Sequence, residues 1–180
     1  ISTGPTLRAE PLIPCDFSTV TELPYGAASR AQLGRLYNRY RFASRFAAAK
    51  DVLEVACGAG QGLGYLARFA RTVTGGDIDE AILSRARARY GDRFRLLCFD
   101  AQELPFEGAS FDLVVLFEAI YYILDPGRFA REAARVLRPG GHLVLCTANK
   151  DLWDFNPSPK SQRYFGPPEL VRLLGQAGLA

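Results

Sequence analysis

After Lys50 the sequence alternates between short apolar segments and longer segments with helical periodicity, which restricts the possible folds more than any other feature. The segment Leu113-Val114-Val115-Leu116-Phe117 is apolar at every position, as is typical of a strand buried on both faces. Strands that alternate with helices form parallel sheets through right-handed crossovers. The sequence therefore predicts an α/β fold with a doubly wound, mostly parallel sheet of about five strands and helices on both faces. We expect strands at 51–56, 72–77, 94–99, 111–117 and 142–147, and helices near 62–70, 79–90, 127–138 and 167–177.

The first 50 residues have a different pattern. Residues 1 to about 28 contain four prolines and scattered polar side chains, which predicts an irregular arm. From Ser29 to Ala49 aromatic and apolar residues recur at helical spacing, and Ser29 is a suitable N-cap. We therefore expect an arm and a capping helix over residues 1–50, followed by the sheet domain over residues 51–180.

Composition excludes several classes of protein. A chain of 180 residues fits one domain, and a net charge of +3 provides no footprint for a nucleic-acid partner. There is no apolar run long enough to span a membrane, so we expect no membrane partner. One histidine without clustered ligands predicts no metal site. The four cysteines form no Cys-x-x-Cys pair, so we expect reduced, buried thiols in a cytoplasmic protein.

The segment from Val52 to Gly64 predicts a nucleotide-type cofactor site. It reads as an apolar strand containing Glu54, a glycine-rich turn, and a helix that begins near Leu63. Glycines allow a ligand to approach the backbone closely, and a helix start presents unpaired N–H groups. A dinucleotide fingerprint that starts at Gly58 needs its third glycine at position 63, but the glycine is at position 62. The glycine spacing therefore argues against a nicotinamide cofactor.

Carboxylates follow the second and third expected strands. Asp77 lies 19 residues after Gly58, near the spacing at which an acidic residue accepts the ribose hydroxyls of a nucleoside. Asp77 could instead cap the next helix, although Asp79 is the better N-cap. Asp100 could accept a hydrogen bond from an exocyclic amine, or could simply form a turn. Because ligands of such sheets bind beyond the carboxyl ends of the strands, these residues are predicted to share one edge.

Several motifs together resemble the class I S-adenosylmethionine-dependent methyltransferases of the small-molecule type. The resemblance covers residues 51 to 147, in the order and spacing of the family. The matching segments are Glu54-Val55-Ala56-Cys57-Gly58-Ala59-Gly60, Gly75-Gly76-Asp77, Asp100-Ala101, Phe111-Asp112-Leu113-Val114-Val115 and Arg135-Val136-Leu137-Arg138-Pro139-Gly140-Gly141. We expect the last of these to end a helix and turn the chain into the fifth strand.

The resemblance implies a Rossmann-like fold over residues 51–180 and S-adenosyl-L-methionine as the cofactor. The implied cofactor-binding residues are Glu54, Gly58, Gly60, Asp77, Ile78, Asp100, Ala101, Phe117 and Tyr40. Among these, Glu54 would support the loop or reach the methionine ammonium, Asp77 would hold the ribose, and Phe117 would lie near the sulfonium. The helix before the first strand often closes over the cofactor in this family, which makes Tyr25, Tyr37 and Tyr40 lid candidates, or else core residues.

The acceptor is expected to be a small molecule bound after the fourth strand. Glu118 and Tyr122 are the candidate catalytic residues there, and the oligomeric state is undetermined. Many relatives carry a histidine base in this segment, where this chain has Tyr121 and Tyr122. The aromatic loop over residues 151–165 could roof a substrate pocket or could be a packed surface loop.

Two alternative functions and one structural departure accompany this prediction. The chain could be a nicotinamide-dependent oxidoreductase, or a non-catalytic cofactor- or partner-binding module. The family sheet normally ends in an antiparallel hairpin, and this sequence stops at Ala180, where the first strand of that hairpin should begin. We therefore expect the hairpin to be missing and the domain to be incomplete at its C-terminus.

Overall fold

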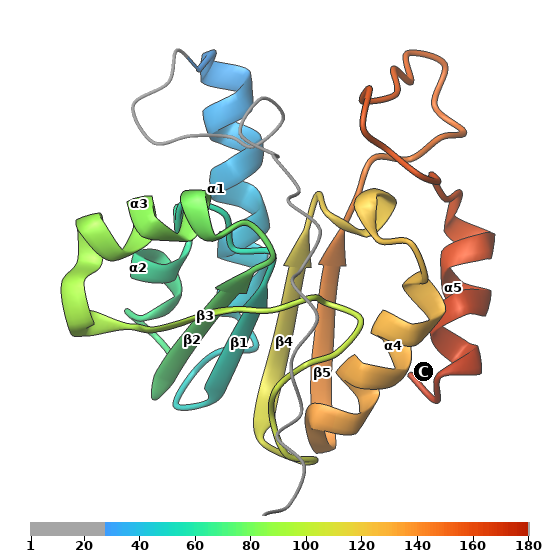
Figure 1. The fold of residues 1–180 in the computed structure, drawn as a ribbon. Coiled ribbons are helices and arrows are strands. Elements are labelled where there is room, and N and C mark those ends of the chain that lie inside the picture. The colour runs from blue at the N-terminus through green and yellow to red at the C-terminus, as the bar shows by residue number, and fades with distance from the viewer. Residues whose placement is uncertain (1–27, 180) are drawn as a thin grey trace, which may run out of the picture.

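The computed structural model describes residues 28–179 and contains one five-stranded sheet with the order β3-β2-β1-β4-β5 (Figure 1). All four strand pairs are parallel. The strands are β1 (Asp51–Val55), β2 (Thr72–Asp77), β3 (Arg95–Cys98), β4 (Phe111–Phe117) and β5 (Leu137–Cys146). The helices are α1 (Arg30–Ser44), α2 (Leu63–Leu66), α3 (Glu80–Tyr90), α4 (Pro126–Val136) and α5 (Pro167–Gln176), with 3-10 turns η1 (Gly91–Arg93) and η2 (Ile120–Tyr122).

Helices cover both faces of the sheet, as the doubly wound prediction requires. Alternate residues of β4 point to opposite sides, because side chains in a strand alternate between the two faces. Leu113 and Val115 pack in a core with α1, α2 and α3, whereas Val114 and Leu116 pack in a second core with α4 and α5. The chain reverses its winding direction between β1 and β4, so the switch point lies at the carboxyl ends of these two strands.

Helix α1 begins where the sequence predicted. Ser29 is the N-cap, and its side chain and that of Gln32 form a reciprocal capping box. The helix ends at Ser44, earlier than expected, and the chain then turns toward β1. Tyr40 and Ala43 lie on its buried face. The arm over residues 1–27, including Tyr25, lies outside the described residues.

The start of β5 was predicted wrongly. The sequence indicated a helix to about residue 138 and a turn at Arg138–Gly141, but α4 ends at Val136 and β5 begins at Leu137. Gly140 has φ +77° and lies inside the strand, where the pairing register with β4 shifts. Leu137 pairs with Phe111 of β4, which places the chain in the sheet there. The guanidinium of the next residue, Arg138, lies 3.0 Å from Asp51 and 2.9 Å from Asp112. These ion pairs join β5 to β1 and β4 at the amino edge.

Other expectations need smaller corrections. Helix α2 has four residues, because the segment after Leu66 continues as hydrogen-bonded turns instead of the helix predicted to residue 70. Cys57 is buried as expected, but Cys98 is exposed, since β3 is an edge strand. Within residues 28–179 the sheet ends at β5, without an antiparallel strand. Over the same residues, no helix is both long and apolar enough to cross a membrane.

Candidate functional site

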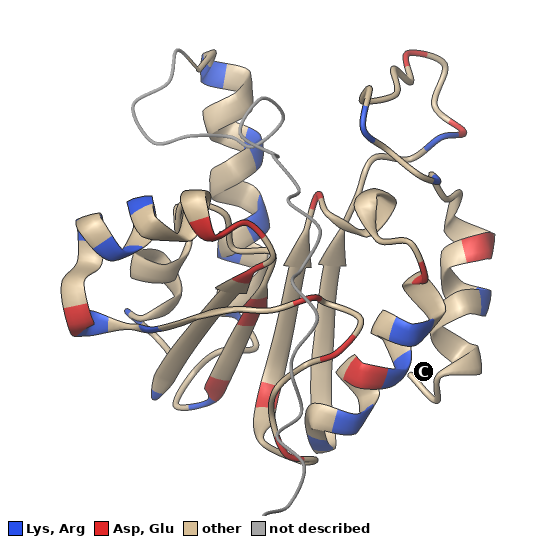
Figure 2. Cartoon of the chain, in the orientation of Figure 1, with Lys and Arg blue, Asp and Glu red and all other residues tan. Residues whose placement is uncertain are grey.

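The carboxyl edge of the sheet brings together the acidic residues that the sequence predicted. Figure 2 shows acidic segments at the upper ends of the central strands and just beyond β4. Asp77, at the end of β2, accepts hydrogen bonds from the N–H groups of Gly58 at 2.8 Å and of Asp79 at 3.0 Å. Asp79 in turn caps α3 through Ala81 and Ile82, as expected. Asp77 therefore joins the glycine loop to the end of β2.

Burial changes the acidity of Asp77. Its side chain is almost entirely removed from water, and this desolvation raises its pKa, although the backbone N–H groups lower it. Each oxygen of a carboxylate can accept two hydrogen bonds, and each oxygen of Asp77 accepts one from the two N–H groups above. Acceptor capacity therefore remains on the Asp77 carboxylate.

A tyrosine of α3 supports the glycine loop. Tyr90 of α3 donates a hydrogen bond to the carbonyl of Gly60 at 2.9 Å. Gly60 has φ +75°, and a Cβ there would lie 3.0 Å from Leu63 and 3.1 Å from Tyr90. The absence of a side chain at Gly60 is thus required by backbone conformation and by packing within the protein.

The third glycine of the motif, which lies at position 62 instead of 63, has a separate physical cause. A Cβ on Gly62 would lie 1.7 Å from Cε1 of Tyr40, so the aromatic ring occupies the space of the missing side chain. Tyr40 comes from α1 and is buried. Gly62 therefore lets α1 pack directly against the loop.

Glu54 combines full burial with an incomplete set of hydrogen bonds. Its side chain is 2% exposed, and its Oε1 accepts a hydrogen bond from Tyr40 at 2.5 Å. Its Oε2 is buried and has no partner among the described residues. Burial raises the pKa of Glu54 to about 7; the Tyr40 hydroxyl opposes this shift and the charge of Asp77 adds to it. A buried, unpartnered carboxylate oxygen is costly unless a donor, and best a cation, binds it.

Phe99, directly after the third strand, forms one aromatic side of the candidate site. Phe99 is buried against Gly76, where a Cβ would lie 1.9 Å from the ring. The carboxylate of Asp100 accepts hydrogen bonds from the backbone and the side-chain amide of Gln102, at 2.8 to 3.1 Å. Asp100 thus has the turn-forming role considered above, while keeping free lone pairs. Ile78 and Ala101 are half-buried beside these strand ends.

A polar network follows β4. Glu118 has φ +50°, an uncommon backbone conformation for a residue other than glycine. Its carboxylate lies 3.7 Å from the guanidinium of Arg39 on α1 and accepts a hydrogen bond from Tyr121 at 3.3 Å. Phe117 contacts Tyr40 edge to face, with ring centroids 5.1 Å apart. Through Tyr40 and Arg39, α1 therefore contacts both the glycine-loop side and the β4 side of the edge.

The aromatic loop folds back onto the segment after β4. Tyr122 shares a 2.8 Å hydrogen bond with Ser158, whose N–H donates to the hydroxyl of Tyr164 at 2.7 Å. Tyr121 stacks on Tyr164 at 4.6 Å, and its carbonyl accepts a hydrogen bond from Gln162 at 2.7 Å. The loop thus lies beside the proposed acceptor side instead of extending away from the sheet.

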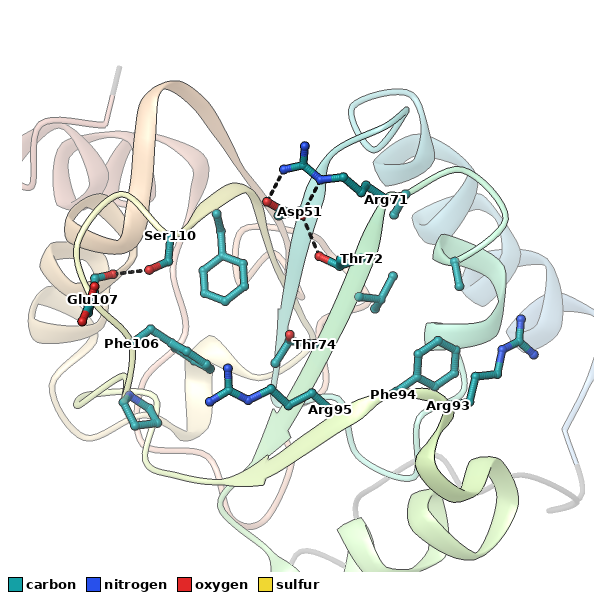
Figure 3. A pocket seen from close by; sticks show the side chains of 15 residues that line it. Asp51, Arg71, Thr72, Thr74, Arg93, Phe94, Arg95, Phe106, Glu107 and Ser110 are labelled. Carbon is teal, nitrogen blue, oxygen red and sulfur yellow. Dashed lines mark hydrogen bonds and ion pairs between the residues drawn. The ribbon is translucent and has the colours of Figure 1, made fainter.

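A distinct pocket lies at the opposite edge of the sheet (Figure 3). It has a volume of about 950 Å³ and is bounded by the amino ends of β1, β2 and β4, with Asp51, Arg71, Thr72, Arg95 and Phe106 among its lining residues. None of the predicted site residues lines it. Its position at the amino edge separates it from the carboxyl edge at which parallel α/β sheets bind ligands.

Sequence reasoning overlooked three residues of the site. Tyr90 and Arg39 lie in helices where an aromatic or a basic residue has many ordinary explanations, so neither carries a motif signal. Tyr121 was noted only as a replacement for histidine. Of the lid candidates, Tyr40 enters the site, whereas Tyr37 is half exposed and packs on Tyr65. Among residues 28–179 no group of three potential metal ligands occurs.

Comparisons with known proteins agree with this geometry. Residues 53–145 match a family model described as a methyltransferase domain. A protein of Mycolicibacterium smegmatis named "Probable S-adenosylmethionine-dependent methyltransferase" is 40% identical over 135 residues, which cover 73% of this chain and 52% of that protein. A phthiotriol/phenolphthiotriol dimycocerosates methyltransferase of Mycobacterium leprae is 38% identical over 114 residues, covering 62% of this chain and 40% of that protein.

A solved structure extends the similarity beyond these relatives. The [4+2]-cyclase SpnF superposes with a TM-score of 0.73 and 26% identity, covering 87% of this chain and 60% of that one. The chain spans about half the length of the curated relatives it matches. Since the family model matches more than half of the residues and the sheet has the order and strand-end residues described above, the chain belongs to the methyltransferase domain family of S-adenosylmethionine-dependent, class I enzymes.

Proposed function

We propose that the chain transfers a methyl group from S-adenosyl-L-methionine to a small-molecule acceptor. The observation that carries the proposal is the buried, unpartnered Oε2 of Glu54, which lies on the same edge as Asp77 and the glycine loop. Among residues 28–179, no cationic donor reaches Oε2 of Glu54 and no hydroxyl donates to Asp77. The methionine ammonium and the ribose of the cofactor supply both kinds of donor.

The described residues fit the cofactor as a set. Glu54 would accept from the ammonium group, Asp77 from the ribose hydroxyls, and Asp100 from the adenine amine. Gly58, Gly60, Ile78, Ala101 and Phe117 would line the same site. Asp100 has less free acceptor capacity than its oxygens alone would offer, because the Gln102 amide already donates to both of them.

When bound, the cofactor supplies a methyl group that is already activated by its sulfonium. The protein's own contribution is then to place the acceptor in line, which can account for about 7–11 kcal/mol of the barrier. Glu118, with the Arg39 guanidinium beside it, is suited to hold an acceptor hydroxyl or amine by accepting its hydrogen bond. Burial, chiefly, raises the pKa of Tyr121, so its phenol stays protonated and serves as a hydrogen-bond donor. Tyr122 would orient the acceptor from the loop side.

The names of the relatives suggest the type of acceptor. The M. leprae relative is named for phthiotriol and phenolphthiotriol dimycocerosates. A relative in Clavibacter sepedonicus is named a demethylmenaquinone methyltransferase and is 34% identical over 101 residues. We therefore propose an apolar acceptor that carries a hydroxyl group or an aromatic ring.

The test is methyl transfer from isotopically labelled S-adenosyl-L-methionine into a lipid extract and, in parallel, into an aqueous metabolite extract. We expect label in the lipid fraction. Label only in the aqueous fraction would keep the enzyme class and reject the apolar acceptor. Glu118→Gln should lower kcat with little change in affinity for S-adenosylhomocysteine, whereas equal loss of both would place Glu118 in cofactor binding.

Two alternatives are separated by calorimetry. Tight binding of NADH without binding of S-adenosylhomocysteine would favour a nicotinamide-dependent oxidoreductase and contradict the proposal. Binding of S-adenosylhomocysteine without any methyl transfer would favour a non-methylating role, a possibility made concrete by the similarity to a protein named a cyclase.

A further inference from the structure

One face of α1 carries basic and apolar side chains that the proposed function does not use. Arg30, Leu33, Tyr37 and Arg41 follow one another at intervals of three and four residues, so they lie in one stripe along the helix. Leu33 is 54% exposed and Tyr37 is 52% exposed. The residues that fix α1 to the protein, Tyr40 among them, lie on its buried face.

The stripe continues onto the segment that begins with α2. Tyr37 contacts Tyr65 edge to face at 5.9 Å, and Tyr65 contacts Phe69 at 5.5 Å. The guanidinium of Arg68 lies over both of these rings, at 5.9 and 6.0 Å. Phe69 is 40% exposed. We refer to Arg30, Leu33, Tyr37, Arg41, Tyr65, Arg68 and Phe69 together as the basic aromatic face.

The charge of this region is entirely positive. Residues 28–50 include six basic residues and no acidic residue, although the whole chain carries a net charge of only +3. The helical blue segments of Figure 2 show this excess along α1. Among the described residues, neither Arg30 nor Arg41 forms an ion pair within 4 Å, whereas Arg39 of the same helix pairs with Glu118. Within residues 28–179, the guanidinium groups of Arg30 and Arg41 therefore have no acidic partner.

We propose that the basic aromatic face docks on an anionic lipid bilayer. Exposed leucine and aromatic side chains enter the interfacial region of a bilayer, and arginines attract its anionic headgroups. Clustered exposed apolar residues with a polar border mark interaction sites in general. Single-stranded nucleic acid binds by stacking its bases on aromatic faces, and a base stacking on the side of Tyr65 and Phe69 where the Arg68 guanidinium lies would have to displace it from 5.9 and 6.0 Å.

Docking would act on the helix that closes the carboxyl edge. Tyr40 and Arg39 of α1 contact Glu54 and Glu118, so a bilayer that holds the outer face of α1 also holds the inner face in place. An apolar acceptor would then reach the edge from the membrane. This last step depends on the proposed function, whereas the docking itself does not.

The test is sedimentation of the full chain with vesicles of phosphatidylglycerol and phosphatidylcholine in equal parts, without a methyl donor. We expect binding at low salt, loss of binding in 0.5 M NaCl, and no binding to pure phosphatidylcholine, because screening removes the attraction to headgroups. Arg41→Glu should weaken partitioning at least about five-fold, since each basic residue near an anionic surface changes it by about that factor. Leu33→Ser should weaken it as well.

Arg35→Glu is the matched control, because Arg35 is exposed on the same helix but lies outside the stripe. We expect this variant to bind almost as well as the unmodified chain. Equal weakening by Arg35→Glu and Arg41→Glu would overturn the assignment to this face. Absence of binding to anionic vesicles, or binding of a single-stranded oligonucleotide that Arg41→Glu abolishes without any vesicle binding, would overturn the proposal. Methyl transfer to a water-soluble acceptor with intact vesicle binding would reject only the apolar acceptor.

Discussion

Glu54 has two carboxylate oxygens in different situations, one bonded to Tyr40 and one buried without a partner among the described residues. This arrangement stabilises the protonated form in the absence of ligand, because desolvation penalises the charge. A bound ammonium group would reverse this preference. The residue is therefore where cofactor binding, folding stability and pH are most directly linked.

Replacing Glu54 by Gln should flatten the pH dependence of stability. As the pH rises, the carboxyl group ionises near 4.5 in the unfolded chain but only at about 7 in the folded chain. Between these values the folded state binds more protons, so the free energy of unfolding falls as the pH rises, by about 3 kcal/mol in total. Urea unfolding at pH 5 and pH 8 measures this. If the free energy of unfolding fell equally between pH 5 and pH 8 in Glu54→Gln and in the unmodified chain, Glu54 would already be charged when folded.

Asp77 should be required for cofactor affinity beyond its structural role. Asp77→Ala removes the acceptor for the ribose and releases the N–H of Gly58, so we expect S-adenosylhomocysteine to bind about 1–3 kcal/mol more weakly. Titration calorimetry measures the affinity. Asp92→Ala, at an exposed carboxylate after α3, is the control. Unchanged affinity in Asp77→Ala would reduce Asp77 to a turn residue.

At the scale of secondary-structure elements, the packing of α1 on the glycine loop depends on Gly62. A side chain there would overlap the ring of Tyr40. We expect Gly62→Ala to destabilise the fold by about 1–3 kcal/mol, the typical cost of overpacking a core. Guanidinium unfolding measures this cost.

Two variants make the Gly62 prediction specific. Gly34→Ala, in α1 where no atom lies within 4 Å of the added Cβ, should instead stabilise the protein by up to about 1 kcal/mol. In a Tyr40→Ala background the cost of Gly62→Ala should largely disappear, because the overlapping ring is absent. A cost that persists in that background would mean that contacts other than the Tyr40 ring demand glycine, because the backbone of Gly62 has ordinary helical angles.

At the scale of the whole molecule, Arg138 connects three strands at the amino edge through Asp51 and Asp112. Hydrogen bonds from neighbouring basic and hydroxyl groups, Arg71 first, hold the pKa of Asp51 well below its usual value. A depressed carboxyl pKa stabilises the fold above the unfolded-state pKa, and the stabilisation is lost as the pH falls toward the folded-state value.

We expect Arg138→Ala to lower the free energy of unfolding only slightly at pH 7, since these ion pairs are partly exposed and screened by solvent. The effect should shrink as the pH falls below about 4, the ordinary carboxyl pKa at which the unfolded chain takes up protons, toward the lower folded-state pKa values of Asp51 and Asp112. Arg131→Ala, whose more exposed ion pair with Asp125 spans 3.7 Å, should change stability by less than half as much. Equal effects of the two variants would deny Arg138 a special role in joining the strands.

The fold was more predictable than the site. Continuous apolar segments such as Leu113–Phe117 identify buried parallel strands, because both faces of these strands must be apolar. The start of β5 was missed because Pro139, Gly140 and Gly141 have local propensities for a turn. Pairing of β5 with β4 on both sides of this segment places it in the sheet in spite of those propensities. Asp77 and Asp100 were placed on the correct edge because the carboxyl ends of parallel strands meet there.

The sequence by itself determined the order of strands and helices, the position of the glycine loop and the edge that carries the acidic residues. Hydrophobic periodicity and backbone preferences act over a few residues, so they can be read locally. The tertiary structure alone decided that Tyr40 occupies the space over Gly62, that Glu54 keeps an unpartnered oxygen, and that α1 presents a basic aromatic face outward. Each of these features depends on how α1 packs against the sheet and the loop, and local sequence preferences do not encode that packing.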